Sequence, residues 1–159
     1  MVARLVRLRA RRRESGAAAV EFALVAPIFL YVLIGIIQYG FYFYAMQAGT
    51  SAVGEVTRRM TVGDCQTSGQ VQALLYGRLG AATTATSASG VTVVPTYTKA
   101  DGTTGTASPG EIGGTVTLSA TFPTVNLHFP LIPLPNSGNV TRSATARIED
   151  VTAITGGCS

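Results

Sequence analysis

The residues best placed to do chemistry lie where a long apolar run begins, in RRRESGAAAVEFALVAP (residues 11–27). Glu21 is the last charged residue before that run, where a carboxylate is costly to bury in a membrane. The carboxylate has three interpretations. It lies at the lipid headgroups without a special role, or it stabilises a helix start through the macrodipole, an effect of about 0.3–1 kcal/mol.

The third interpretation requires a cut of the chain between Gly16 and Ala17. The cut would create an ammonium group on Ala17, with a pKa of about 8. Ala17 and Glu21 are four residues apart and so share one helix face. Because a paired charge is tolerated in a low-dielectric bundle and an unpaired one is not, the new amine would make Glu21 acceptable there.

Cys65 and Cys158 are the only cysteines, and both fall in the part of the chain that we expect outside the membrane. Oxidising compartments favour pairing, so we predict an intramolecular disulfide. It would close a long loop and contribute about 4–5 kcal/mol in the chain-entropy model. Two free thiols or an intermolecular bridge are the alternatives.

Catalytic and metal-binding patterns are missing from the sequence. There is no nucleophile motif, Walker loop or dinucleotide-binding glycine pattern, and the carboxylates are scattered. The two cysteines and the distant His128 make a poor metal site. We therefore predict a non-catalytic protein with no cofactor, no metal and no small-molecule substrate.

The positive charge is concentrated at the N-terminus. Residues 1–16 carry six arginines and one glutamate, a net charge of +5, whereas residues 17–159 carry six basic and seven acidic side chains, a net charge of −1. A basic tail of this kind can bind nucleic acid. Because it directly precedes an apolar run, the better interpretation is a cytoplasmic anchor under the positive-inside rule, and we predict no nucleic-acid partner.

The apolar run is long enough to cross a membrane. Residues 22–54 contain no charged side chain, and FALVAPIFLYVLIGII (22–37) is followed by three tyrosines within residues 39–44. The run exceeds the roughly 20 residues that a spanning helix needs, and the tyrosines fit an interfacial aromatic belt. A secretory signal peptide is the rival, but its apolar region has only about 7–15 residues and ends at a small-residue cleavage site, which we do not find here.

A basic leader, a glycine, then AAAVEF and a long apolar helix together resemble a class III (prepilin-type) signal. More narrowly, the stretch resembles the TadE-like family, pilin-like proteins of the tight-adherence (Tad/Flp) pilus system. The family motif is a glycine, four residues, and then Glu-Phe or Glu-Tyr. Gly16, Glu21 and Phe22 match it, and the resemblance is strong over about residues 13–50 and weak beyond.

The resemblance implies a function as a minor pilin or pseudopilin in pilus assembly. It implies cleavage between Gly16 and Ala17 by a prepilin peptidase, and use of Glu21 in assembly. The implied partners are membrane lipid, other pilin-like subunits, the prepilin peptidase and the Tad inner-membrane assembly machinery. The implied location is the bacterial inner membrane, with the N-terminus in the cytoplasm, or an extracellular pilus after assembly.

The whole chain is predicted to have an α+β fold with four parts. These are a basic leader (1–16), a transmembrane helix (17–45), its continuation as a stalk (46–62) and an outer head (63–159). In the head we expect a short helix capped by Ser68, with an apolar stripe, and a three-stranded antiparallel sheet packed on that helix and on the stalk. The stripe is Val71, Leu74, Leu75 and Leu79, and the predicted strands are 91–97, 113–123 and 140–149.

Two questions stay open at this level. The loop 123–138 is rich in proline and large apolar residues, and it either folds over the sheet or forms a contact surface for a partner. The function also has an alternative, an uncleaved single-pass membrane-anchored protein whose outer domain recruits a partner. A secreted enzyme or effector is disfavoured because the sequence offers no catalytic site.

Overall fold

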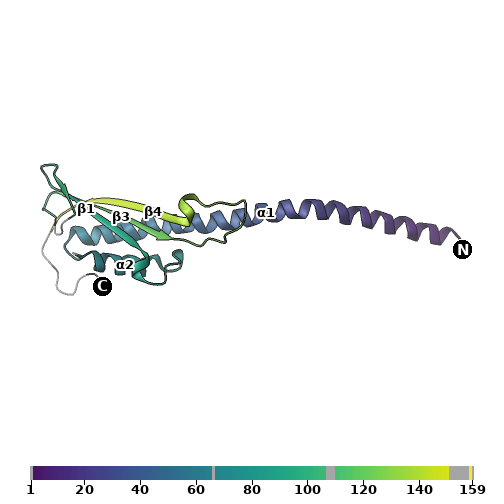
Figure 1. Ribbon diagram of the computed structural model, residues 1–159, viewed down its shortest axis with the longest axis horizontal. Helices are drawn as coiled ribbons and strands as arrows, with labels where there is room; N and C mark the ends of the chain where they lie inside the picture. Colours follow the sequence, from purple (N-terminus) through teal and green to yellow (C-terminus); the bar gives the residue numbers. More distant parts are fainter. Residues whose placement is uncertain (1, 66, 107–109, 151–157, 159) are drawn as a thin grey trace. The chain divides into compact units, whose positions relative to one another are not determined.

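A computed structural model (Figure 1) describes residues 2–65, 67–106, 110–150 and 158, with side chains from Gly16 onward. It divides into two compact units, residues 1–37 and 38–159. The elements in chain order are α1 (Val2–Thr61), α2 (Ser68–Leu79), the 3-10 turns η1 (Gly80–Ala82) and η2 (Ala88–Gly90), β1 (Thr92–Thr98), β2 (Thr104–Gly105), β3 (Thr115–Pro123), the 3-10 turn η3 (Pro135–Gly138) and β4 (Asn139–Arg147).

The sheet has four antiparallel strands in the order β2-β1-β3-β4, so the prediction of three strands was wrong. The additional strand, β2, has two residues and pairs with Tyr97 and Thr98 at the end of β1. In the sequence its segment has the turn-forming residues of a connection between strands. A strand of two residues is too short to show an alternating pattern, so the sequence did not predict it. The three longer strands lie close to the predicted ranges, 91–97, 113–123 and 140–149.

The central strand, β3, confirms the predicted alternation of apolar and polar residues. Its register with β1 extends from Thr115 to Thr121, and its register with β4 extends over all nine residues. The buried side chains of β3 are Val116, Leu118, Ala120 and Phe122. The opposite face is lined by hydroxyls, two pairs of which bond across β3 and β4: Thr117 with Thr145 (2.8 Å) and Thr121 with Thr141 (2.9 Å).

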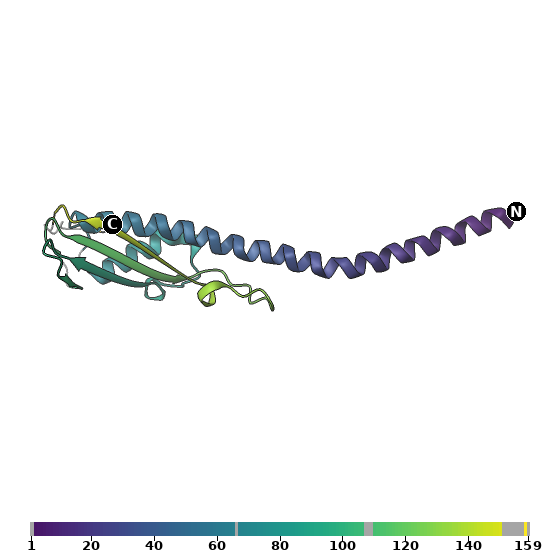
Figure 2. The ribbon, with the colours of Figure 1, turned by 90° about the horizontal axis from the view of Figure 1, so that it is seen from above.

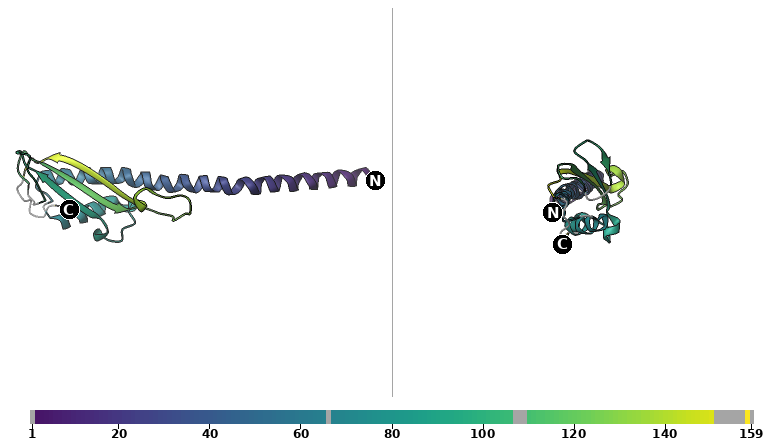
Figure 3. Two further views of the ribbon diagram at one scale, coloured as in Figure 1. Left: turned by 45° about the horizontal axis from the view of Figure 1, so that its top comes forward. Right: turned by 90° about the vertical axis from the view of Figure 1, so that its left-hand side faces the viewer.

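The second unit has two layers, because α2 and the C-terminal part of α1 share one core with the inner face of the sheet. The prediction that the sheet packs on both helices is therefore confirmed. Figures 2 and 3 show β3 and β4 extending along this part of α1. The buried apolar residues of the helices are Ala45, Ala52, Val53, Val56 and Met60 of α1 and Val71, Leu75 and Leu79 of α2.

Gly63 ends α1 close to the predicted position. Its φ of +76° is the left-handed conformation that glycine adopts without steric cost. The backbone N–H of Gly63 donates to Met60 O (3.3 Å), and that of Asp64 donates to Arg59 O (3.1 Å). These two bonds form a Schellman motif, which satisfies the last carbonyls of the helix.

The start of α2 differs by one residue from the prediction, because Thr67 caps the helix and Ser68 does not. The backbone N–H of Gln70 donates to Thr67 Oγ1 (3.3 Å), and the backbone N–H of Thr67 donates to Gln70 Oε1 (3.1 Å). This reciprocal pair is a capping box. Either hydroxyl could cap a helix, and the side chain of Gln70 selects Thr67.

Candidate functional site

The predicted processing site lies within a continuous stretch of α1. Gly16 and Ala17 are both exposed on the helix, and a Cβ added to Gly16 would meet no atom within 4 Å. The backbone of the arginine-rich leader from residue 2 is also helical, whereas its side chains up to residue 15 lie outside the described part. Cleavage between Gly16 and Ala17 remains a prediction.

Glu21 and Phe22 are exposed on the same helix, one turn beyond Ala17. Because α1 is unbroken here, Ala17 and Glu21 are neighbours on one face. Among the described side chains, none forms an ion pair with Glu21. An amine on Ala17 would be within reach of this carboxylate, but their pairing also remains a prediction.

The apolar residues that follow Glu21 are not covered by the described chain. Eight large apolar residues between positions 22 and 37 are more than half exposed: Phe22, Leu24, Val25, Ile28, Phe29, Leu30, Val32 and Ile36. In the described residues, one helix, Gly16–Thr61, is long and apolar enough to cross a membrane, with a mean hydropathy of 2.5 in its most apolar window. So much exposed apolar surface requires a cover of lipid or of other helices, and this helix could be a membrane anchor.

Gln38 follows directly after this exposed segment, and its side chain is almost fully buried, at 1% exposure. Its Nε2 donates to Val125 O (3.0 Å), and its Oε1 accepts from the backbone N–H of Leu127 (2.8 Å). The hydroxyl of Tyr39 donates to Pro133 O (2.9 Å). We define residues 124–138 as the β3–β4 loop. Sequence reasoning did not single out Gln38, although it is a polar amide in an otherwise apolar stretch.

The predicted disulfide between Cys65 and Cys158 is present, with a Cα–Cα distance of 5.1 Å across 93 positions in the sequence. It ties the C-terminal segment to the chain just after α1. The backbone N–H of Cys158 also donates to Asp64 Oδ1 (2.8 Å), and those of Glu149 and Asp150 both donate to Thr61 O (3.0 Å). The end of α1 and the residues just after it therefore hold Glu149, Asp150 and Cys158.

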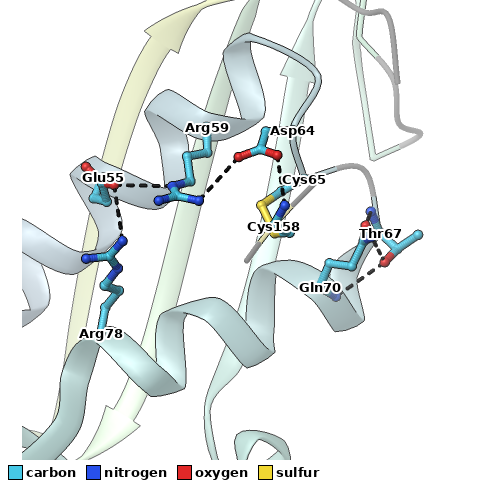
Figure 4. The surroundings of a disulfide bond; sticks show 8 residues. All are labelled: Glu55, Arg59, Asp64, Cys65, Thr67, Gln70, Arg78 and Cys158. Atoms are coloured by element: carbon cyan, nitrogen blue, oxygen red, sulfur yellow. Dashed lines mark hydrogen bonds and ion pairs between the residues drawn. A yellow bond between two sulfur atoms is a disulfide. The ribbon is translucent and has the colours of Figure 1, made fainter. Parts of the chain in front are cut away.

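A chain of charged residues extends from this disulfide toward α2 (Figure 4). Arg59 contacts Asp64 (Nη1–Oδ2, 3.4 Å) and Glu55 (Nε–Oε1, 3.2 Å). Arg78 of α2 contacts the same Glu55 oxygen at 3.6 Å. All four side chains are partly exposed, so each ion pair contributes little to stability on its own.

The described residues offer little for metal binding or acid–base chemistry. Among them, no three His, Cys, Asp or Glu side chains cluster as metal ligands. His128 is exposed in the β3–β4 loop. A shallow hollow between the end of α1, α2 and β1 is lined by Met60, Val71 and Tyr97, with neighbouring threonine, serine and proline side chains. That lining contains no carboxylate, histidine or cysteine.

The comparisons with known proteins concern the N-terminal part of the chain. Residues 16–58 match the family model described as TadE-like protein. No curated protein and no solved structure matches the chain. The match and the long apolar helix fit a pilin-like protein related to the Tad pilus. The resemblance to the TadE-like family that Gly16, Glu21 and Phe22 indicated is therefore confirmed, and residues 16–58 form its TadE-like segment.

Proposed function

We propose that this chain is a minor pilin or pseudopilin that supports assembly of a tight-adherence pilus. In this proposal residues 1–16 are a cytoplasmic leader, residues 17–45 span the inner membrane, residues 46–62 continue the helix, and residues 63–159 form a head outside. A prepilin peptidase removes the leader. The processed helix then packs against helices of other pilin-like subunits under the control of the Tad assembly machinery.

The observation that carries this proposal is the exposed carboxylate of Glu21 at the start of an uncovered apolar helix, within the TadE-like segment. Such a helix cannot bury its own surface, so it must associate with lipid or with other helices. A carboxylate among packed apolar helices is tolerated when a positive group pairs with it. Removal of the leader would provide that group, the amine of Ala17, one turn before Glu21.

The first test is the N-terminus of the membrane-purified protein, measured by intact mass in cells with and without a prepilin peptidase. We expect the chain to begin at Ala17 with the peptidase and to retain the leader without it. Gly16→Leu should block the cut, whereas Ala19→Leu, at another exposed position three residues after Gly16, should leave it intact. If wild-type protein keeps Met1 while the peptidase is active, the chain is instead an uncleaved membrane-anchored protein.

The second test separates processing from assembly. Glu21→Gln keeps the size of the side chain and removes its charge. We expect this variant to be cleaved normally but lost from the pilus fraction released by shearing, because the amine of Ala17 then has no anionic partner. Gln47→Glu, at an exposed position of α1 outside the predicted span, is a control for a general change of charge. Normal recovery of Glu21→Gln in the pilus fraction would contradict the role given to Glu21.

A further inference from the structure

The β3–β4 loop (residues 124–138) is bound to α1 at the residues that directly follow its most apolar stretch. Gln38 holds the loop by two hydrogen bonds to the backbone of Val125 and Leu127, and Tyr39 holds it by one to Pro133. Figure 1 shows this loop beside α1, beyond the end of β3. Because Gln38 is buried in these contacts, the loop and this turn of the helix form one local structure.

The loop presents apolar side chains to solvent. Leu131 is 87% exposed and Leu127 is 46% exposed. No Asp, Glu, Lys or Arg occurs anywhere in residues 112–141, and four prolines lie between residues 123 and 135. An exposed apolar surface without charges is unfavourable in water unless something covers it.

The backbone at Leu131 is also in an uncommon conformation. Its φ of +70° is in the left-handed region, which non-glycine residues seldom adopt and which costs free energy. Within the described chain this cost is not offset by burial, because the side chain points into solvent. Burial of the Leu131 side chain against a surface outside the chain would supply the free energy that offsets this cost.

We propose that Leu127 and Leu131 insert into the lipid bilayer, in the outer interfacial part of the predicted span (17–45). This inference rests on the membrane anchoring in the proposed function. Residues 22–37 are the predicted core of the span, and Gln38 and Tyr39 come next in the helix, at the start of the tyrosine-rich stretch typical of a membrane interface. A loop bonded to these two residues lies at the same depth in the membrane as they do. At that depth lipid surrounds the subunit even before it contacts another protein.

The proposed contact gives the loop a mechanical role. The loop continues into β3 and β4, and β3 packs on α1 through Phe122. Two leucines in the interface, together with the helix, would hold the head against the membrane at two points. The head would then leave the membrane only when the loop is also withdrawn, as a subunit must do when it enters a filament.

The test uses the full-length chain in vesicles of phosphatidylethanolamine and phosphatidylglycerol. Both native cysteines are in the disulfide, so a cysteine introduced by Leu131→Cys can be labelled alone with an environment-sensitive fluorophore. Ile112→Cys is the matched control, an exposed aliphatic residue (59%). Ile112 precedes the start of β3, whereas the β3–β4 loop follows its end. The two ends of this strand are about 26 Å apart, at a rise of about 3.3 Å per residue. Ile28→Cys reports on the span itself.

We expect the label at position 131 to be quenched by nitroxide-labelled lipid and to lose its quenching by aqueous iodide, with the reverse at position 112. Lipid quenching at 28 but iodide quenching at 131 would overturn this inference and leave the membrane anchor intact. Protection at 131 without lipid quenching, and only at high protein density, would assign the loop to a second copy of the chain and also overturn it. Iodide quenching at both 28 and 131 would overturn the anchor and the loop contact together.

Discussion

The ring of Phe122 occupies the space that a side chain at position 49 would need. A Cβ added to Gly49 would lie 2.6 Å from Cζ of Phe122 and 3.3 Å from Cγ of Arg142. Phe122 is fully buried, so a shift of its ring would displace the side chains packed around it. Gly49 therefore sets the distance at which α1 packs on β3.

Gly49→Ala should destabilise the head, because overpacking a full core costs about 1–3 kcal/mol, more than the gain in helix propensity. Gly54→Ala is the matched control on the same helix, where an added Cβ meets nothing within 4 Å. It should stabilise the protein by about 0.5–1 kcal/mol. Urea unfolding of the purified chain in detergent, followed by the near-ultraviolet tyrosine signal, measures both. Equal stabilisation by the two substitutions would show that the close approach is absent.

Loss of the Cys65–Cys158 disulfide should lower stability by about 2–5 kcal/mol, because the cross-link restricts the unfolded chain. Cys158→Ser should unfold at lower urea than wild type, and a reducing agent should lower the stability of wild type to a similar level. The double variant Cys65→Ser/Cys158→Ser should not respond to the reducing agent. On a non-reducing gel wild type should migrate as a monomer, and a disulfide-linked dimer would refute the intramolecular bridge.

Gln38→Leu should loosen the β3–β4 loop, because it leaves Val125 O and the N–H of Leu127 without their partner. An unpaired, partly buried polar group costs about 1–3 kcal/mol. Hydrogen–deuterium exchange of the peptide that contains Leu127 should become faster in this variant. Gln47→Leu, at an exposed position on the same helix, should leave that exchange unchanged. Identical exchange in the two variants would mean that Gln38 does not hold the loop.

Thr67→Ala should cost about 1 kcal/mol, because it removes the acceptor that caps α2. The neighbouring Ser68→Ala should change stability by less than about 0.5 kcal/mol, since Ser68 is exposed and does not cap the helix. The two urea midpoints decide between the observed cap and the one predicted from the sequence. A larger loss for Ser68→Ala would restore the original prediction.

Asp101 should titrate below its ordinary range. Hydrogen bonds from the hydroxyl (2.7 Å) and the backbone N–H (2.8 Å) of Thr103 lower the pKa of its carboxyl, and the charge of Lys99 lowers the pKa less. The ionised carboxylate of Asp101 stabilises this turn, and its pKa is lower in the folded than in the unfolded chain. The stabilisation is therefore fully present above the unfolded pKa and is lost as pH falls through the folded pKa. Thr103→Val should raise the pKa of Asp101 more than Lys99→Gln does, as measured by NMR titration. The opposite order would make the charge of Lys99 the main cause.

Patterns confined to neighbouring residues predicted much of the fold. The alternation from Val116 to Phe122 identified the buried face of β3, since the side-chain period of a strand is local. The predicted boundary between the stalk (46–62) and the head (63–159) lies close to the observed end of α1, where Gly63 has the positive φ that glycine adopts readily. The apolar stripe of α2 followed from helical spacing in the same way, and three of its four residues, Val71, Leu75 and Leu79, are buried.

The candidate site was also visible in the sequence, because it is one contiguous motif. Gly16, Ala17, Glu21 and Phe22 lie within seven positions, and the regular helix alone brings Ala17 next to Glu21. No packing against the head is needed for that relationship. Its chemistry depends on a cut and on partner helices, and so it remains a prediction.

By itself, the sequence determined the apolar helix with its basic leader, the TadE-like motif, the three long strands and the availability of two cysteines for a bridge. Only the tertiary structure decided that Gln38 holds Val125, that Gly49 makes room for Phe122, and that two residues of the β1–β3 connection join the sheet as β2. Periodicity and turn preference are properties of neighbouring residues. In contrast, the contacts of Gln38 and Gly49 are with residues far away in the sequence. Such contacts form only once the whole core has packed.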